Sequence, residues 1–313
     1  MTTTTQSRAG PDRVTLAAFV LAVLLAGANG LAIGFSNDEL PPYWGAAVRF
    51  LAAGLVCAAI VAARRLPVPR GRALAGMMLY GLLGIGLSFG LLYWALVEVP
   101  TGVGVVLLAL VPLATLILAV AQRVEPFRWL AATGAVVGAA GVGLIFADQL
   151  GGSVPPLALL AVLGAALGIA QSNVLIKRLP EVHPITTNAV AMLTGALLLA
   201  GVSLALGEQW VLPHLAVTWL AIGHLVLVGT VVVYALGLFV LTRWTASSAS
   251  YLHILLPLVA VPLGAVFRHE PVSPLFVLGA LIVIGGVYIG VVLAAREPRV
   301  AVVRPAPIEA AER

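Results

Sequence analysis

The chain has 313 residues, of which 61% are hydrophobic and only 9% charged, and its mean hydropathy is +1.11. Soluble domains carry about 25% charged residues, so this composition excludes an ordinary soluble enzyme and also a disordered chain. The net charge of +5 does not indicate nucleic-acid binding, because the basic residues gather on one side of the predicted spans. The single cysteine, Cys57, excludes a disulfide framework.

Ten apolar segments follow one another along the chain, each bounded by charged residues, prolines or polar turns. They hold many glycines and alanines and almost no alternation of period two, which favours helices over a β-barrel. Each is long enough to cross a hydrocarbon core of about 30 Å. The predicted fold is therefore an all-α integral membrane protein with ten transmembrane helices. The predicted spans are Val14–Phe35, Tyr43–Ala63, Ala73–Val97, Gly102–Ala121, Trp129–Ala147, Leu157–Ile176, Thr187–Leu206, Leu215–Leu241, Ser247–Phe267 and Leu275–Ala295.

The first apolar segment has some features of a secretory signal. Arg8 and Arg13 precede it, and Ala26-Gly27-Ala28 resembles a cleavage site. The apolar run nevertheless continues to Phe35, which is too long for a signal peptide. We therefore expect an uncleaved first span.

The basic residues predict the orientation in the membrane. If the N-terminus is cytoplasmic, all 17 Lys and Arg residues except Arg49 and Arg268 fall in cytoplasmic loops or tails. The positive-inside rule then places both termini in the cytoplasm, and we expect a multi-pass protein of the inner membrane. The loops on the opposite side are acidic, with Asp38, Glu39, Glu98, Asp148, Glu208 and Glu270.

The second half of the chain repeats the first. Leu91–Ile145 aligns with Leu236–Gly290 without a gap. Because each repeat has an odd number of spans, we expect two inverted five-helix repeats, an arrangement that supports alternating access to a path between them. The expected division is a tail at 1–13, repeats at 14–147 and 157–295, and a tail at 296–313. The aligned pairs include Pro112 with Pro257, Arg123 with Arg268, Glu125 with Glu270, Pro126 with Pro271, Gly134 with Gly279, and Gly141 with Gly286.

Motifs along nearly the whole chain, from Val14 to Ala295, resemble the EamA-type family of the drug/metabolite transporter superfamily. The resemblance implies ten helices around a central cavity, with the fifth and tenth at the periphery. It also implies transport of small organic solutes, commonly the export of amino acids or other metabolites. The matching residues are Ala28-Asn29-Gly30, Pro42, Arg49-Phe50, Tyr93-Trp94-Ala95-Leu96, Leu110-Val111-Pro112, Glu125 and the glycine-rich stretch from Gly134 to Gly143.

Arg49 is the charged residue that falls within a predicted span, about seven residues or roughly 10 Å below its outer end. Intramembrane charges are costly and often mark a transport path. Arg49 could bind a substrate carboxylate. Alternatively it is structural, and either reaches outward or pairs with Glu39, Glu98 or backbone carbonyls.

Further polar side chains within the spans are candidates for lining the cavity. The histidines could carry a proton during transport, or could be neutral and bonded to a neighbouring helix. The amides could instead form bonds between helices, and Tyr93 and Trp94 could belong to an aromatic belt. These candidates are Asn29, Tyr80, Tyr93, Trp94, Gln171, Asn173, His224, Tyr234, Tyr251 and His253.

Two prolines and two glycine pairs predict features of the packing. Pro112 and Pro257 fall at the centres of the fourth and ninth spans, where we expect bends that act as hinges or shape the cavity. The pairs Gly134/Gly138 and Gly286/Gly290 let helices approach closely, and on peripheral helices they could form a homodimer interface.

The chain carries none of the common catalytic or nucleotide-binding motifs, so we expect no enzyme activity, no cofactor and no metal ion. The leading interpretation is a secondary transporter, in the direction of export, of amino acids or related zwitterions. Its partners would be the solute and the lipid bilayer, not nucleic acid. One alternative is a proton-coupled multidrug exporter, which the lack of a midspan carboxylate disfavours. An intramembrane enzyme or a scaffold is the alternative from another class.

Overall fold

The computed structural model describes residues 12–98, 104, 107–145, 155–180, 182–268 and 274–294. Over these residues the fold is all-α, without a strand, as the composition predicts. The helices are α1 (Arg13–Gly27), α2 (Asn29–Asn37), α3 (Pro42–Ala63), α4 (Arg72–Gly81), the π-helix η1 (Leu82–Leu87), α5 (Ser88–Glu98), α7 (Val111–Ala121), α8 (Trp129–Ile145), α9 (Pro156–Ile176), α10 (Pro184–Ala205), α11 (Ala216–Gly223), the π-helix η3 (His224–Val232), α12 (Val233–Arg243), α13 (Ala246–Ser250), α14 (Leu252–Arg268), α15 (Pro274–Val287) and the π-helix η4 (Tyr288–Leu293).

Six helical stretches within the described ranges are long and apolar enough to cross a membrane by length and composition, and four shorter apolar helices accompany them. Each of them overlaps one of the apolar segments predicted from the sequence. The chain is therefore an integral membrane protein. The six long stretches are Arg13–Asn37, Pro42–Ala63, Arg72–Glu98, Pro156–Ile176, Pro184–Ala205 and Ala216–Arg243.

Several of the long stretches are not continuous α-helices. The first is broken at Ala28, between α1 and α2, where Gly27 lies so close to α14 that an added Cβ would be 2.3 Å from the Cβ of Val259. The third and the sixth, Arg72–Glu98 and Ala216–Arg243, contain the π-helices η1 and η3. Such segments occur often at functional sites, and both of these lie in the middle of their spans.

Pro112 and Pro257 do not occupy equivalent positions in their helices, although the sequence predicts matching bends. Pro112 is in the first turn of α7, directly after a turn at Ala109 and Leu110, so the fourth span is interrupted there rather than bent. Proline suits this place because the first N–H groups of a helix have no partner within it. Pro257 lies inside α14 together with Pro262, and there it removes a hydrogen bond from the ladder.

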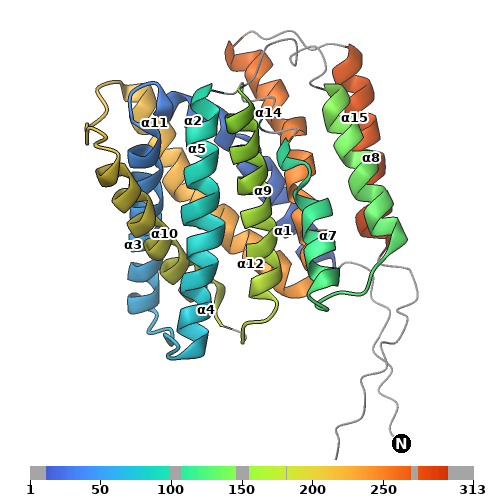
Figure 1. The fold of residues 1–313 in the computed structure, drawn as a ribbon, viewed down its shortest axis with the longest axis horizontal. Coiled ribbons are helices and arrows are strands. Elements are labelled where there is room, and N and C mark those ends of the chain that lie inside the picture. Colours follow the sequence, from blue (N-terminus) through green and yellow to red (C-terminus); the bar gives the residue numbers. More distant parts are fainter. Residues whose placement is uncertain are drawn as a thin grey trace, which may run out of the picture.

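The bundle is built from helix pairs that join the two halves of the chain. α3 packs against α10, α8 against α15, α5 against α9 and α1 against α12. Figure 1 shows α8 and α15 side by side at one end of the molecule, and α3 and α10 at the other. The helices between these end pairs bring both halves together in the middle of the bundle.

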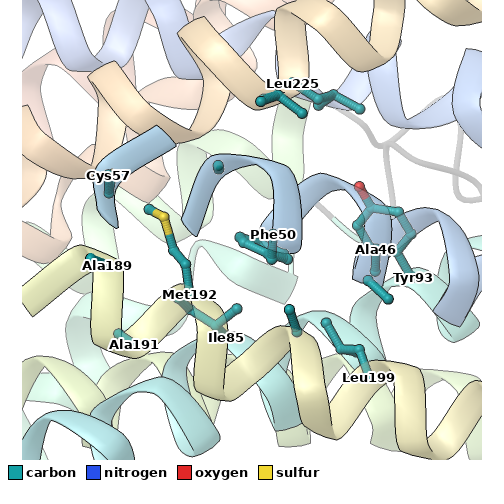
Figure 2. Close-up of a cluster of buried hydrophobic side chains, with 14 of the residues drawn as sticks. Ala46, Phe50, Cys57, Ile85, Tyr93, Ala189, Ala191, Met192, Leu199 and Leu225 are labelled. Atoms are coloured by element: carbon teal, nitrogen blue, oxygen red, sulfur yellow. The ribbon is translucent and has the colours of Figure 1, made fainter. Parts of the chain in front are cut away.

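The largest buried cluster lies around Phe50 of α3 (Figure 2). Cys57 on the same helix and Met192 and Leu199 of α10 belong to it, and each is almost fully buried. Small residues let the two helices approach closely, since a Cβ at Gly54 would lie 3.0 Å from the side chain of Leu193. This contact fixes one end of the bundle.

Facing glycines hold α8 against α15 and η4 at the other end. A Cβ at Gly134 would lie 2.5 Å from the Cα of Gly290, and a Cβ at Gly286 would lie 2.6 Å from the backbone nitrogen of Gly138. The two glycine pairs therefore face each other within one chain. These glycines are thus covered within the chain and are not the open surface that a homodimer interface at these pairs would need.

Candidate functional site

A cavity of about 220 Å³ lies in the middle of the bundle, lined by residues of the first, second, third, fourth, sixth, eighth and ninth predicted spans. It is smaller than the roughly 300–1,000 Å³ of pockets for drug-sized ligands, so it suits a small solute. Most of its lining is apolar. The polar side chains that line it are Asn29, Arg49, Tyr80, Ser172, Asn173, Tyr234 and His253.

Arg49 is the buried charged group of this cavity, and its side chain is 1% exposed. Its guanidinium donates from Nε to Oγ1 of Thr230 at 2.7 Å and from Nη1 to the hydroxyl of Tyr93 at 3.2 Å. Nη2 donates to the carbonyl of Gly229 at 3.2 Å. A guanidinium has five N–H donors, so these three bonds leave two of them unused.

The carbonyl of Gly229 is shared between two side chains. It accepts from Nδ2 of Asn29 at 3.0 Å as well as from Arg49. Gly229 belongs to η3, and a Cβ there would lie 2.0 Å from Oδ1 of Asn29, so only glycine permits this approach. Oδ1 of Asn29 is buried and has no hydrogen-bond partner, and other atoms of the residue line the cavity.

No carboxylate within the described part of the chain neutralises Arg49. Two aromatic rings lie near it instead, with the Arg49 Cζ at 5.0 Å from the ring centre of Phe50 and 5.4 Å from that of Phe89. Glu39, one of the expected partners, accepts hydrogen bonds from the backbone of His214 and Leu215. Of the structural alternatives for Arg49, pairing with a backbone carbonyl is the one observed.

Two of the four candidate tyrosines line the cavity. Tyr80 and Tyr234 do so, and Tyr234 lies next to Phe89 with 6.3 Å between ring centres. Tyr93 is fully buried against Arg49, which excludes it from an aromatic belt, and it does not line the cavity. Tyr251 is also buried outside the cavity, where its hydroxyl donates to the carbonyl of Ala131.

The two histidines lie in different surroundings. His253 lines the cavity, and its Nδ1 is 3.0 Å from the carbonyl oxygen of Ser250. A carbonyl only accepts, so Nδ1 carries the hydrogen and Nε2 of a neutral ring is an acceptor. His224 does not line the cavity, and its Nε2 is buried without a hydrogen-bond partner.

Of the remaining candidates, Asn173 lies on a helix face that lines the cavity, whereas Gln171 and Trp94 lie on faces that do not. Asn173 of α9 lines the cavity, whereas Gln171 points to Gln122, to which it is joined by a hydrogen bond of 2.7 Å. Trp94 packs among apolar residues outside the cavity, because α5 turns it away from the centre. Ser172 lines the cavity although the sequence did not single it out.

Two further residues at Arg49, Thr230 and Phe89, were not predicted from the sequence. Thr230 is a polar residue in an apolar span and could have been noticed on that ground. Phe89 gives no such signal, because one phenylalanine among many apolar residues is ordinary. Its proximity to Arg49 depends on the packing of α5 against α3.

Comparison with known proteins agrees with this architecture. The model of the EamA-like transporter family matches residues 14–147 and 156–292. The inner membrane transporter YedA of Escherichia coli (strain K12) is 28% identical over 255 residues, which cover 80% of this chain and 81% of YedA. The transporter YvbV of Bacillus subtilis (strain 168) is 26% identical over 251 residues, or 78% and 80% of the two chains. One solved crystal structure has a similar fold, with a TM-score of 0.75, 23% identity, and coverage of 90% of this chain and 98% of the other.

Proposed function

This chain belongs to the EamA-like transporter family and is a membrane transporter, and on that premise we propose that it exports amino acids or related carboxylate-bearing metabolites. The proposed mechanism is alternating access in the inner membrane, with both termini in the cytoplasm. No nucleotide motif occurs in the sequence, so transport would be secondary.

Arg49 is the observation that carries the proposed substrate class. A guanidinium with two open donors and no carboxylate partner in the described chain favours a solute that brings its own carboxylate. The unpaired Oδ1 of Asn29 and Nε2 of His253 are acceptors at the same cavity, and they suit an ammonium or hydroxyl group. The apolar remainder of the lining suits a small apolar side chain.

We further propose that the helices form ten spans in two inverted repeats. In the alignment of the two halves, Gly134 corresponds to Gly279 and Gly141 corresponds to Gly286. If the halves are equivalent, a contact between Gly134 and Gly286 should therefore be matched by one between Gly279 and Gly141. The contacts follow this exchange, since a Cβ at Gly134 would lie 2.6 Å from the oxygen of Gly286, and one at Gly141 would lie 2.9 Å from the oxygen of Gly279. The contacts between helices agree with the same exchange of halves. The contact of α5 with α9 corresponds to that of α12 with α1, and the contact of α10 with η1 corresponds to that of α3 with η3.

A competition panel in proteoliposomes tests the substrate class. We expect saturable transport of leucine and of its keto acid, because each brings a carboxylate to Arg49. We expect none of ethidium, because the cavity offers this permanent cation no carboxylate, and Arg49 repels it. Saturable transport of ethidium alone would contradict the proposal and favour the multidrug exporter.

Substitution of the prolines tests a hinge in the proposed cycle. Pro257→Ala supplies an N–H that can bond to the carbonyl of His253 and stiffen α14, so we expect exchange to slow by about tenfold. Pro112→Ala adds an N–H in the first turn of α7, where it gains no partner, and we expect a change within about twofold. Counterflow rates of the folded variants measure both. Equal rates for the two variants would rule out a hinge at Pro257.

A further inference from the structure

A second cavity, of about 120 Å³, lies next to the central one. It is bounded by the end of α9 and the loop after it, the start of α10, the end of α12, and Met77 of α4. Its polar lining residues are Lys177, Thr187 and Thr242. Lys177 is half-buried, and Thr242 is exposed, so the cavity opens near the ends of these helices.

Two leucines separate this cavity from the central one. Leu238 and Leu241 are the residues that line both. They are three positions apart in α12 and so share a face of the helix, and they are only 3% and 4% exposed. A closely packed apolar layer of this kind excludes water and charged solutes until the helix moves.

Lys177 brings a positive charge to the second cavity. Its ammonium donates to the carbonyl of Trp244. The carboxylate of Glu125 acts on it electrostatically but forms no salt bridge with it, since no carboxylate of the described residues lies within 4.0 Å of the ammonium. An ammonium has three donors, so two remain open. Thr242 uses its hydroxyl hydrogen on the carbonyl of Phe239 at 2.9 Å, and Lys177 is the charged residue among those that line the cavity.

We propose that this cavity is a loading site, in which Lys177 binds the carboxylate of a solute before Leu238 and Leu241 admit it to the central cavity. The inference rests on the proposed function. Lys177 and Arg49 then form two cationic stations on either side of the leucine barrier. In the proposed topology the loading site faces the cytoplasm, the side from which an exporter takes its solute.

Cysteine labelling tests the barrier without requiring transport. Cys57 is 1% exposed and is first replaced by serine. Thr242→Cys then reports on the second cavity, and Gly237→Cys reports on the central one, where a new Cβ would meet no atom within 4 Å. With an impermeant maleimide added on the Lys177 side, we expect Thr242→Cys to react at least about tenfold faster than Gly237→Cys. Adding Leu241→Ala should raise the labelling of Gly237→Cys by about tenfold, because the barrier is opened.

The anion site is tested by protection of the same reporter. We expect leucine to slow the labelling of Thr242→Cys by about threefold, and its decarboxylated analogue isoamylamine to have no effect, because Lys177 binds the carboxylate. Lys177→Gln should remove the protection. Arg243→Gln, a matched loss of charge on a residue that lines neither cavity, should keep it.

Two results would overturn the inference. One is equal labelling of Thr242→Cys and Gly237→Cys, which would mean that no barrier exists. The other is protection that persists in Lys177→Gln. A protein that labels as expected but transports neither leucine nor its keto acid would contradict the proposed function and leave the loading site intact.

Discussion

Replacing Arg49 with methionine is expected to lower the transport of leucine by roughly 10–100-fold, the loss of one charge-assisted interaction of about 1.5–3 kcal/mol with the carboxylate. Methionine fills much of the space of the arginine stem and removes the charge. Arg49→Lys keeps the charge but has one nitrogen in place of the fork that reaches Thr230, Tyr93 and Gly229, so it should restore transport only in part. Initial rates in proteoliposomes measure the effect.

The structural role of Arg49 requires a control within the same experiment. Its removal leaves the Gly229 carbonyl with Asn29 as its remaining side-chain donor, so the variant should also unfold at a lower temperature in detergent. Rates are therefore compared for vesicles that hold equal amounts of folded protein. Parental leucine transport by folded Arg49→Met would show that the guanidinium does not bind the solute.

Gly134→Ala is expected to destabilise the protein by about 1–3 kcal/mol, the usual cost of overpacking. The new Cβ would lie 2.5 Å from both the Cα and the nitrogen of Gly290. These are backbone atoms and cannot turn aside, so α8 and η4 must separate. Gly143→Ala makes the same change on the same helix at a place with no atom within 4 Å, and it should cost nothing. Thermal unfolding in detergent compares the two, and equal losses would contradict the contact.

Hydropathy was sufficient to predict the helices but not their interruptions. An apolar segment of about 20 residues has few alternatives to a helix in lipid, so all the predicted segments overlap observed helices. The break at Ala28 and the π-helices η1 and η3 leave no comparable mark in the sequence. They depend on contacts between helices, such as Gly229 with Asn29, which the sequence does not encode locally.

The candidate site was predicted in part for a related reason. Asn29, Arg49 and His253 were chosen because polar groups are costly in lipid, and all three line the cavity. Gln171 was chosen on the same ground but pairs with Gln122. A helix that is apolar on all sides carries no periodicity to show which face is central. The cost of polar groups in lipid therefore predicts which residues are buried but not the direction in which each side chain points.

Arg49 also carries its charge within the electric field of the membrane. A unit charge that crosses the whole field exchanges about 2.3 kcal/mol per 100 mV, so each tenth of the field is worth about 0.2 kcal/mol. A bound keto acid would cancel this charge, whereas a zwitterion would leave it in place. In the proposed cycle, a membrane potential that is negative inside would therefore oppose the outward step of the transporter when an amino acid is bound. The same potential would not affect the outward step when a keto acid is bound.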